Sequence, residues 1–537
     1  MMRKTDRPYK DFVPVIFASV SWIFAFPLGN FNGFPVFTFI ALSAVYYGTL
    51  SRPIHRVVLY YAVIGLLSTA AGAHWLTAVH GFALVAAIVY KALLFAVLGC
   101  ASYFINTMPK RLLRILYWAL LWVLFDAVSH AGALSFPYLC LPYSFAGSWL
   151  GLRLAGFGSL YLLSFIAAFT SASFVELMLL LQHHRLANNA SVHAQNHYAN
   201  AKSFLSAPPL VRAVLLVIFC FSMLFLIPPS QQSAPDPAEP SKTIALIQSN
   251  YYSFAPVQKD FDTSFTILAA LTQQASAAHP DLIVWHETAL VPPVFWYAHQ
   301  PANNTERIFS NKVLSFLQTV HVPLLTGVTW IDFDDFKRTK EYNAAVLVER
   351  GAIKQVYKKM RLVPFAEYFP FFKALPGITR WIISLFGPLR TPGTDPAVFS
   401  LSGFTFSAPI CFEDSYLSVF AQFGNLPCFI VLTEDSWSKS TALKRQHLAM
   451  SQMRAAETGS WIIRASNSGM TAVINSKGFI VAMLEPDTQD VLIAKVPGSV
   501  PVKHFAWFLF IPVGAAVLAL LIVLCTIRKG ARQNRVS

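Results

Sequence analysis

Three short segments of the sequence place a chemically reactive side chain where a strand is expected to end. They are WHETAL with Glu287, YKKMRLVPFAEYFP with Lys359, and PICFED with Cys411. Loops at the edge of a sheet often carry binding and catalytic groups, so a carboxylate, an ammonium and a thiol could meet there. Taken singly, each residue has an ordinary explanation, because a cysteine that ends a strand is usually a small buried hydrophobe and the two charged residues are usually exposed.

In this order, and with these neighbours, the three segments resemble the Glu-Lys-Cys triad of the nitrilase superfamily. The resemblance implies that Glu287 removes the proton of the Cys411 thiol, since a thiol with a pKa of about 8.5 is mostly neutral at pH 7. Lys359 and the backbone amide of Phe412 would stabilise the negative charge that develops on the carbonyl oxygen under attack. The side chains expected to keep a buried Lys359 charged are two carboxylates, Glu367 and Glu413.

A sheet covered by helices is needed to position these groups, and the stretch 241–500 has the pattern of such a fold. Its β-rich runs predict strands at 243–248, 281–285, 323–330, 344–349, 405–411, 429–433, 461–465, 470–475 and 491–496. The clearest helical patterns lie at 260–278, 305–319 and 441–458. Helices between strands favour an α/β domain.

The rest of the chain is much more apolar. Of its 537 residues, 55% are hydrophobic and only 12% are charged, whereas soluble domains are about 25% charged. Apolar stretches near the length of about 20 residues that crosses a bilayer predict about eight spans, at 11–28, 32–50, 57–78, 82–105, 112–130, 154–181, 212–229 and 504–527. We therefore expect a polytopic α-helical membrane domain with seven spans at 1–229, a Pro-rich linker at 230–240, the α/β domain at 241–500, and an eighth span with a basic cytoplasmic tail at 501–537.

The formal charge of +15 is explained by the arrangement of these spans. Lys and Arg are concentrated in alternate connections, namely 1–10, 52–56, 110–114, 185–212 and 528–535. The short connections near 79–81 and 131–153 hold one basic residue, Arg153. Because basic loops stay in the cytoplasm, this asymmetry places the α/β domain on the outer face and argues against a nucleic-acid partner. Three charged residues lie within the spans: Lys91 and Glu176 are expected near helix ends or facing the interior, and Asp126 to support an outer loop.

Further segments narrow the resemblance to one membrane branch of that superfamily, the apolipoprotein N-acyltransferases. They are AGAHW at 71–75 and the longer blocks 136–165 and 436–474. The resemblance implies an αββα sandwich and a transfer in two steps, in which Cys411 takes a fatty acyl chain from a phospholipid as a thioester and the α-amine of a diacylglyceryl-cysteine then accepts it. It implies no cofactor and no metal, a monomer in the bacterial inner membrane, and a catalytic domain that faces the periplasm.

The sequence departs from the family pattern at several positions. His286 stands where most members have Pro before the catalytic Glu, Phe412 where many have Tyr, and Ala366 where Gly is usual before Glu367. The usual Asn-Asp-Ala-Trp-Phe stretch reads Glu-Asp-Ser-Trp-Ser from Glu434 onward. None of these changes removes a triad member, so the expected reaction type is unaffected. The aromatic side chains expected to line the substrate site are Trp437, Tyr143 and Trp75.

Other site types and functions find less support. The six cysteines form no CxxC pair, and the histidines of 182–212 have no compact ligand spacing, so neither a disulfide framework nor a metal site is predicted. A membrane-tethered amidase would use the same triad but pass the acyl group to water, although a simple tether needs only one span. A transporter or sensor with an inert outer domain would be expected to show repeated halves, which are absent from the sequence.

Overall fold

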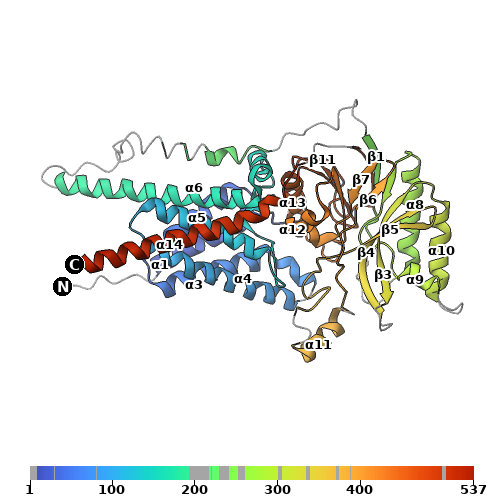
Figure 1. Ribbon diagram of the computed structural model, residues 1–537, viewed down its shortest axis with the longest axis horizontal. Coiled ribbons are helices and arrows are strands. Elements are labelled where there is room, and N and C mark those ends of the chain that lie inside the picture. The colour runs from blue at the N-terminus through green and yellow to red at the C-terminus, as the bar shows by residue number, and fades with distance from the viewer. Residues whose placement is uncertain are drawn as a thin grey trace. The chain divides into compact units, whose positions relative to one another are not determined.

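The structure is a computed structural model that describes residues 9–29, 31–79, 81–192, 214, 217–218, 221–228, 241–251, 261–299, 305–333, 339–370, 374–386, 389–498 and 503–536. The chain divides into two compact units, coloured along the sequence in Figure 1. The helical unit comprises Met1–Ser129, Tyr138–Pro229 and Phe510–Ser537. The sandwich unit comprises His130–Pro137 and Ser230–Leu509.

The described part of the helical unit is built from long apolar helices joined by short connections (Figure 1). The helices are α1 (Tyr9–Ala25), α2 (Val36–Thr49), α3 (Ile54–Gly72), α4 (Gly81–Ser102), α5 (Arg111–Ser129), α6 (Trp149–Val192) and α14 (Ile511–Val536). Among the described residues, five segments are long and apolar enough to cross a membrane, at Ile54–Gly72, Gly81–Thr107, Arg111–Ser129, Trp149–Gln182 and Ala506–Ile527. Val13–Ala25 and Val36–Thr49 are apolar but shorter. The expected span at 212–229 is described only in part, so the total of eight stays a prediction.

Charged side chains inside the helical unit are buried and have polar partners, as apolar surroundings require. Glu176 accepts a hydrogen bond of 2.9 Å from the Tyr46 hydroxyl and lies 3.3 Å from Arg111. Lys91 is also buried, and its Nζ lies 3.7 Å from the sulfur of Cys140. The burial of Glu176 and Lys91 confirms the expectation that they face the interior.

Asp126 contacts the 131–153 connection, which it was expected to support, through hydrogen bonds to the backbone of Leu141 and the side chain of Cys140. It is fully buried on α5 and accepts a hydrogen bond of 2.5 Å from the Ser164 hydroxyl on α6. The bond with Ser164 therefore joins α5 and α6.

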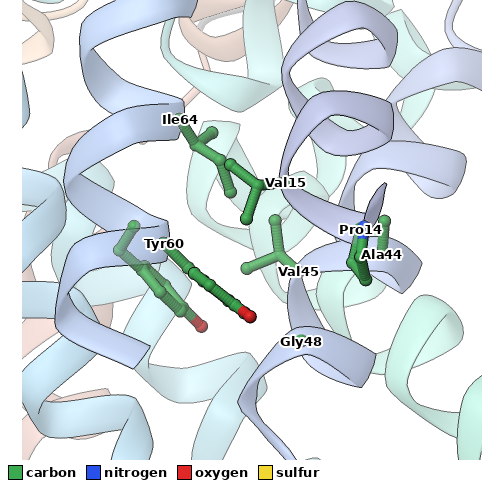
Figure 2. A pocket seen from close by; sticks show the side chains of 8 residues that line it. Pro14, Val15, Ala44, Val45, Gly48, Tyr60 and Ile64 are labelled. Carbon is green, nitrogen blue, oxygen red and sulfur yellow. The ribbon is translucent and has the colours of Figure 1, made fainter. Parts of the chain in front are cut away.

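A small apolar pocket lies between α1, α2 and α3 of the helical unit (Figure 2). It is lined by Pro14, Val15, Ala44, Val45, Gly48, Tyr60, Tyr61 and Ile64. None of the predicted site residues belongs to this lining, and no side chain in it could act as a nucleophile at neutral pH. The predicted triad, Glu287, Lys359 and Cys411, lies in the sandwich unit.

The sandwich unit contains two six-stranded sheets (Figure 1). The first has the order β12-β1-β2-β3-β4-β5, with β1 (Ser241–Gln248), β2 (Leu282–Val284), β3 (Leu324–Phe333), β4 (Thr339–Glu349), β5 (Ala352–Lys358) and β12 (Asp490–Pro497). The second has the order β11-β10-β9-β8-β7-β6, with β6 (Phe399–Leu401), β7 (Phe404–Ser407), β8 (Cys428–Thr433), β9 (Trp461–Ser466), β10 (Ala472–Ile474) and β11 (Ile480–Met483). In each sheet three neighbouring strands are parallel, β1-β2-β3 and β7-β8-β9, so their carboxyl ends share one edge.

Helices pack on both sheets, and the sheets contact each other through β1 and β9. Helix α8 (Phe261–Ser276) packs on β1, β2 and β12, and α10 (Thr305–Thr319) on β4. Helix α13 (Thr441–Thr458) packs on β9 and β10. Apolar side chains of the first sheet, such as Trp285 and Ile283, form one core with Leu268 of α8, and this burial fixes the strand ends that carry the site. The shorter helices are α9 (Val294–Tyr297), α11 (Pro376–Phe386) and α12 (Leu417–Phe423).

Candidate active site

Lys359 lies directly after β5, and its ammonium is bound by two carboxylates. Its Nζ donates to Glu287 Oε1 at 3.2 Å and to Glu367 Oε1 at 3.0 Å. Only 1% of Lys359 is exposed, and burial alone would lower the pKa of its ammonium. The carboxylates of Glu287 and Glu367 outweigh burial and raise that pKa above its ordinary value, so Lys359 is charged at neutral pH.

The amide of Asn343, on β4, completes the hydrogen bonding of these carboxylates. Its Nδ2 donates to Glu287 Oε1 at 2.7 Å and to Glu367 Oε1 at 2.9 Å. Glu367 also accepts from the backbone N–H of Val363 at 2.8 Å. Burial would raise the pKa of Glu367, but the Lys359 ammonium and these donors lower it. Asn343 was not predicted from the sequence, because a single Asn within a strand belongs to no recognisable motif.

Cys411 begins the short 3-10 turn η4 (Cys411–Ser415), immediately after the β-bridge between Ile410 and Leu432. Its backbone is left-handed, with φ of +52°, which costs about 1–3 kcal/mol for a residue other than Gly and persists only where neighbours hold it. Cys411 as a whole residue is partly exposed. Burial and the Glu287 carboxylate raise the pKa of the Cys411 thiol well above its ordinary value, although the Lys359 ammonium opposes this shift. The resting nucleophile is therefore a neutral thiol that needs a base at the moment of attack.

Glu413 joins the turn of Cys411 to the loop of Lys359. Its Oε2 accepts from the backbone N–H of Ile410 at 2.7 Å, and its Oε1 accepts from the N–H groups of Met360 and Arg361 at 2.8 and 2.9 Å. The Tyr357 hydroxyl donates to it as well, at 2.8 Å. Burial raises the pKa of Glu413 to about 7 despite these donors. Glu413 was expected only as a counter-charge for Lys359, and the geometry gives it a positioning contact in addition.

Asp414 of η4 belongs to a buried network of charged side chains. Arg464 on β9 donates to Asp414 Oδ2 and to Asp435 Oδ2, both at 2.9 Å. The ring of His447, on α13, lies between the same carboxylates, with Nδ1 3.0 Å from Asp435 Oδ1 and Nε2 3.2 Å from Asp414 Oδ1. Burial and Arg464 would lower the pKa of His447, but the two carboxylates raise it to about 9. The positive charges of Arg464 and His447 therefore balance the negative charges of Asp414 and Asp435. Arg464 supports the site without being one of the triad residues.

The unusual residues His286 and Glu434 lie close together beside Glu287. His286 Nδ1 is 2.8 Å from the Glu287 carbonyl oxygen and 3.8 Å from Glu434 Oε2. Asn467 donates to Glu434 Oε2 at 2.9 Å, and Ser249 lies 2.9 Å from His286 Nε2. Burial lowers the pKa of His286 to about 4 and raises that of Glu434 to about 8, so both are neutral at pH 7.

The remaining predicted residues are placed as follows. Phe412 is buried, with its ring edge-on to Tyr416 at a centroid distance of 5.0 Å. Trp437 is partly exposed in the sandwich unit. Tyr143 and Trp75 are buried in the helical unit. Substrate contact by Trp437, Tyr143 and Trp75, and a role for the Phe412 amide, stay predictions. Across the described residues, no group of three or more His, Cys, Asp or Glu side chains could hold a metal ion.

Comparison with known proteins gives matches in both units. The apolipoprotein N-acyltransferase N-terminal domain matches residues 18–173, and the carbon-nitrogen hydrolase family matches residues 243–500. Apolipoprotein N-acyltransferase 1 of Treponema pallidum is 30% identical over 406 residues, which cover 71% of this chain and 70% of that protein. Apolipoprotein N-acyltransferase 1 of Treponema denticola is 26% identical over 488 residues, with 87% and 86% covered. The enzyme of Azotobacter vinelandii is 28% identical over 411 residues, with 75% and 72% covered.

Among solved structures, an amidase from Nesterenkonia sp. covers 48% of this chain and 91% of its own at 15% identity, with a TM-score of 0.35. We draw no conclusion from a structural similarity of this extent.

Proposed function

Since this chain belongs to the apolipoprotein N-acyltransferase family, we propose that its Cys411 carries a fatty acyl chain from a membrane phospholipid to the α-amino group of the diacylglyceryl-cysteine of apolipoproteins. The product is an amide, and the lipoprotein leaves with three acyl chains. The observation that carries the proposal is the Lys359 ammonium. It is buried between two carboxylates, and its positive charge acts on the Cys411 thiol.

In the first half of the reaction Glu287 takes the Cys411 proton as the sulfur attacks the ester carbonyl of the phospholipid. The negative charge on the carbonyl oxygen is stabilised by Lys359 and the Phe412 amide. When the C–O bond breaks, the proton held by Glu287 passes to the leaving alkoxide, which departs as a lysophospholipid. A C–S bond has replaced a C–O bond, and the acyl chain is a thioester on Cys411.

In the second half the uncharged α-amine of the acceptor attacks the thioester carbonyl. The nitrogen loses a proton to Glu287 as the C–N bond forms, and the same oxyanion donors serve again. The C–S bond then breaks, and the proton returns from Glu287 to the sulfur. The thiol is restored, and the proposed cycle calls for neither a soluble cofactor nor a metal.

The proposed setting follows from the lipid nature of both substrates. We place the enzyme in the bacterial inner membrane as a monomer with eight spans and the 241–500 domain on the periplasmic face. Support comes from the apolar helices and from the concentration of Lys and Arg in alternate connections.

The test uses purified full-length protein and vesicles of phosphatidylethanolamine and phosphatidylglycerol. We expect mass spectrometry to find an acyl adduct on Cys411, and a diacylated lipopeptide with a free amine to discharge it as an N-acylated product. A Cys411→Ala variant should give neither, whereas Cys428→Ser, which alters a buried cysteine on β8, is the matched control and should give both. Release of free fatty acid with the lipopeptide left unmodified would favour the membrane-tethered amidase.

A further inference from the structure

Residues His130–Pro137 belong to the sandwich unit, although the chain on both sides of them, up to Ser129 and from Tyr138, belongs to the helical unit. The contacts of this segment with the rest of the sandwich unit include those with the side chains of Arg361, Tyr368 and Tyr416. Each of these lies within five residues of a proposed site residue: Arg361 follows Lys359, Tyr368 follows Glu367, and Tyr416 follows Cys411.

The contacts themselves are short, and two of the residues that make them, Ser135 and Tyr416, are buried. Ser135, which is 2% exposed, accepts a hydrogen bond of 2.7 Å from the Arg361 guanidinium, and its hydroxyl lies 2.7 Å from that of Tyr416. Arg361 also donates to the carbonyl of Gly132, and its guanidinium stacks over the Tyr416 ring at 4.7 Å. The Tyr368 hydroxyl donates to the carbonyl of Ala133 at 2.5 Å.

These contacts reach the reacting groups through one further bond. The backbone N–H of Arg361 donates to Glu413, whose other oxygen binds the N–H of Ile410, next to Cys411. The backbone N–H of Tyr416 donates to the Glu413 carbonyl at 3.0 Å, which closes η4. The 130–137 segment thus bridges the loop that carries Lys359 and Glu367 and the turn that carries Cys411, at a point away from Glu413.

We infer that the 130–137 segment is a positioning element of the acyl-transfer site, and that Ser135, Arg361 and Tyr416 hold the Lys359 loop in register with the Cys411 turn. The inference rests on the proposed function, because it assigns a role relative to the residues proposed there. Ser135 and Arg361 act through other residues and need not touch the lipid. A shift of about 1 Å between nucleophile and oxyanion donor is enough to lower the rate about 100-fold.

The experiment measures single-turnover formation of the Cys411 thioester by full-length protein, with the same vesicles over a range of phospholipid concentration. We expect Arg361→Met to lower the limiting rate constant about 10- to 100-fold, with little change in the concentration that gives half the limiting rate. Arg361→Lys keeps one donor and should recover part of the loss. Ser135→Ala and Tyr416→Phe should each lower the rate constant. Because both variants remove the contact between Ser135 and Tyr416, the double variant should be no slower than the slower of the two single variants.

The matched control is Lys312→Ala, which breaks an exposed ion pair with Asp262 elsewhere in the sandwich unit and should leave the rate unchanged. Folding is followed by thermal unfolding, and Ser135→Ala, which removes only one hydroxyl, keeps the test decisive if Arg361→Met fails to fold. Parent-like rates in Ser135→Ala, Tyr416→Phe and Arg361→Met, with Cys411→Ala inactive, would overturn this inference alone. Transfer by Cys411→Ala would instead overturn the proposed function.

Discussion

Replacement of Lys359 by Met tests the centre of the proposed site, because Met has a similar length and no charge. The ammonium lies between Glu287 and Glu367, whose side chains are 6% and 16% exposed. Removal of one partner from a buried ion pair costs about 3–5 kcal/mol of folding free energy, since a charge is left without compensation. Lys358→Met is the matched control: its partner Asp332 is 38% exposed, and an exposed pair of this kind contributes about 0–1 kcal/mol.

The same substitution should lower thioester formation about 100- to 1000-fold, the usual effect of removing one oxyanion donor. The double variant Lys359→Met with Glu367→Gln separates the two effects, because one of the uncompensated carboxylates is gone. We expect it to recover stability in thermal and denaturant unfolding and to stay inactive in the mass-spectrometric assay for the Cys411 adduct. The reasoning is refuted if Lys359→Met forms the adduct within about tenfold of the parent rate, or if it unfolds no more easily than Lys358→Met.

Three further predictions concern the groups around the triad. Glu413→Gln should lower stability by about 1–3 kcal/mol and slow thioester formation, because its amide nitrogen would face the N–H of Ile410; unchanged unfolding would contradict this. His447 has a pKa of about 9 in the folded protein against 6.5 ordinarily, so its contribution to stability is complete below about 6.5 and is lost as the pH rises through about 9. Unfolding measured across that window should show a decline that His447→Gln abolishes. Burial raises the pKa of Glu434 to about 8, so Glu434→Gln should leave the rate of thioester formation at pH 7 nearly unchanged. The parent protein should lose stability as the pH rises from about 4.5 to 8, and the variant should not show this loss. A large loss of rate at pH 7 in the variant would show that Glu434 is ionised there.

The sequence predicted the sandwich unit well where hydrophobic runs were long. Helices α10 and α13 begin and end at the predicted residues 305–319 and 441–458. Strand β5 was not predicted, because AIKQVYK has neither a continuous apolar run nor a regular alternation of apolar and polar residues. The run 405–411 was expected to be one strand, but β7 ends at Ser407, because Pro409 has no N–H for the sheet and the left-handed backbone of Cys411 does not fit a strand.

The site was harder to predict, because contacts between distant segments leave no local pattern. The spacing of Glu287, Lys359 and Cys411 resembled a known triad, and the matches to the family confirm the recognition of that family. The proximity of His286 and Glu434 was not foreseen, since they follow strands in different sheets. Nor could the position of residues 130–137 in the sandwich unit be inferred from a segment that lacks any periodic pattern.

The antiparallel pairing of β1 with β12 has a consequence for how such a protein could arise. The first residue of β1, Ser241, is opposite the last residue of β12, Pro497, and partners in an antiparallel pair have Cα atoms about 4.5–5.5 Å apart. The two ends of the 241–497 stretch of the sandwich unit therefore lie next to each other. A domain whose two ends are adjacent can be inserted into a loop of another protein without disrupting the fold of either.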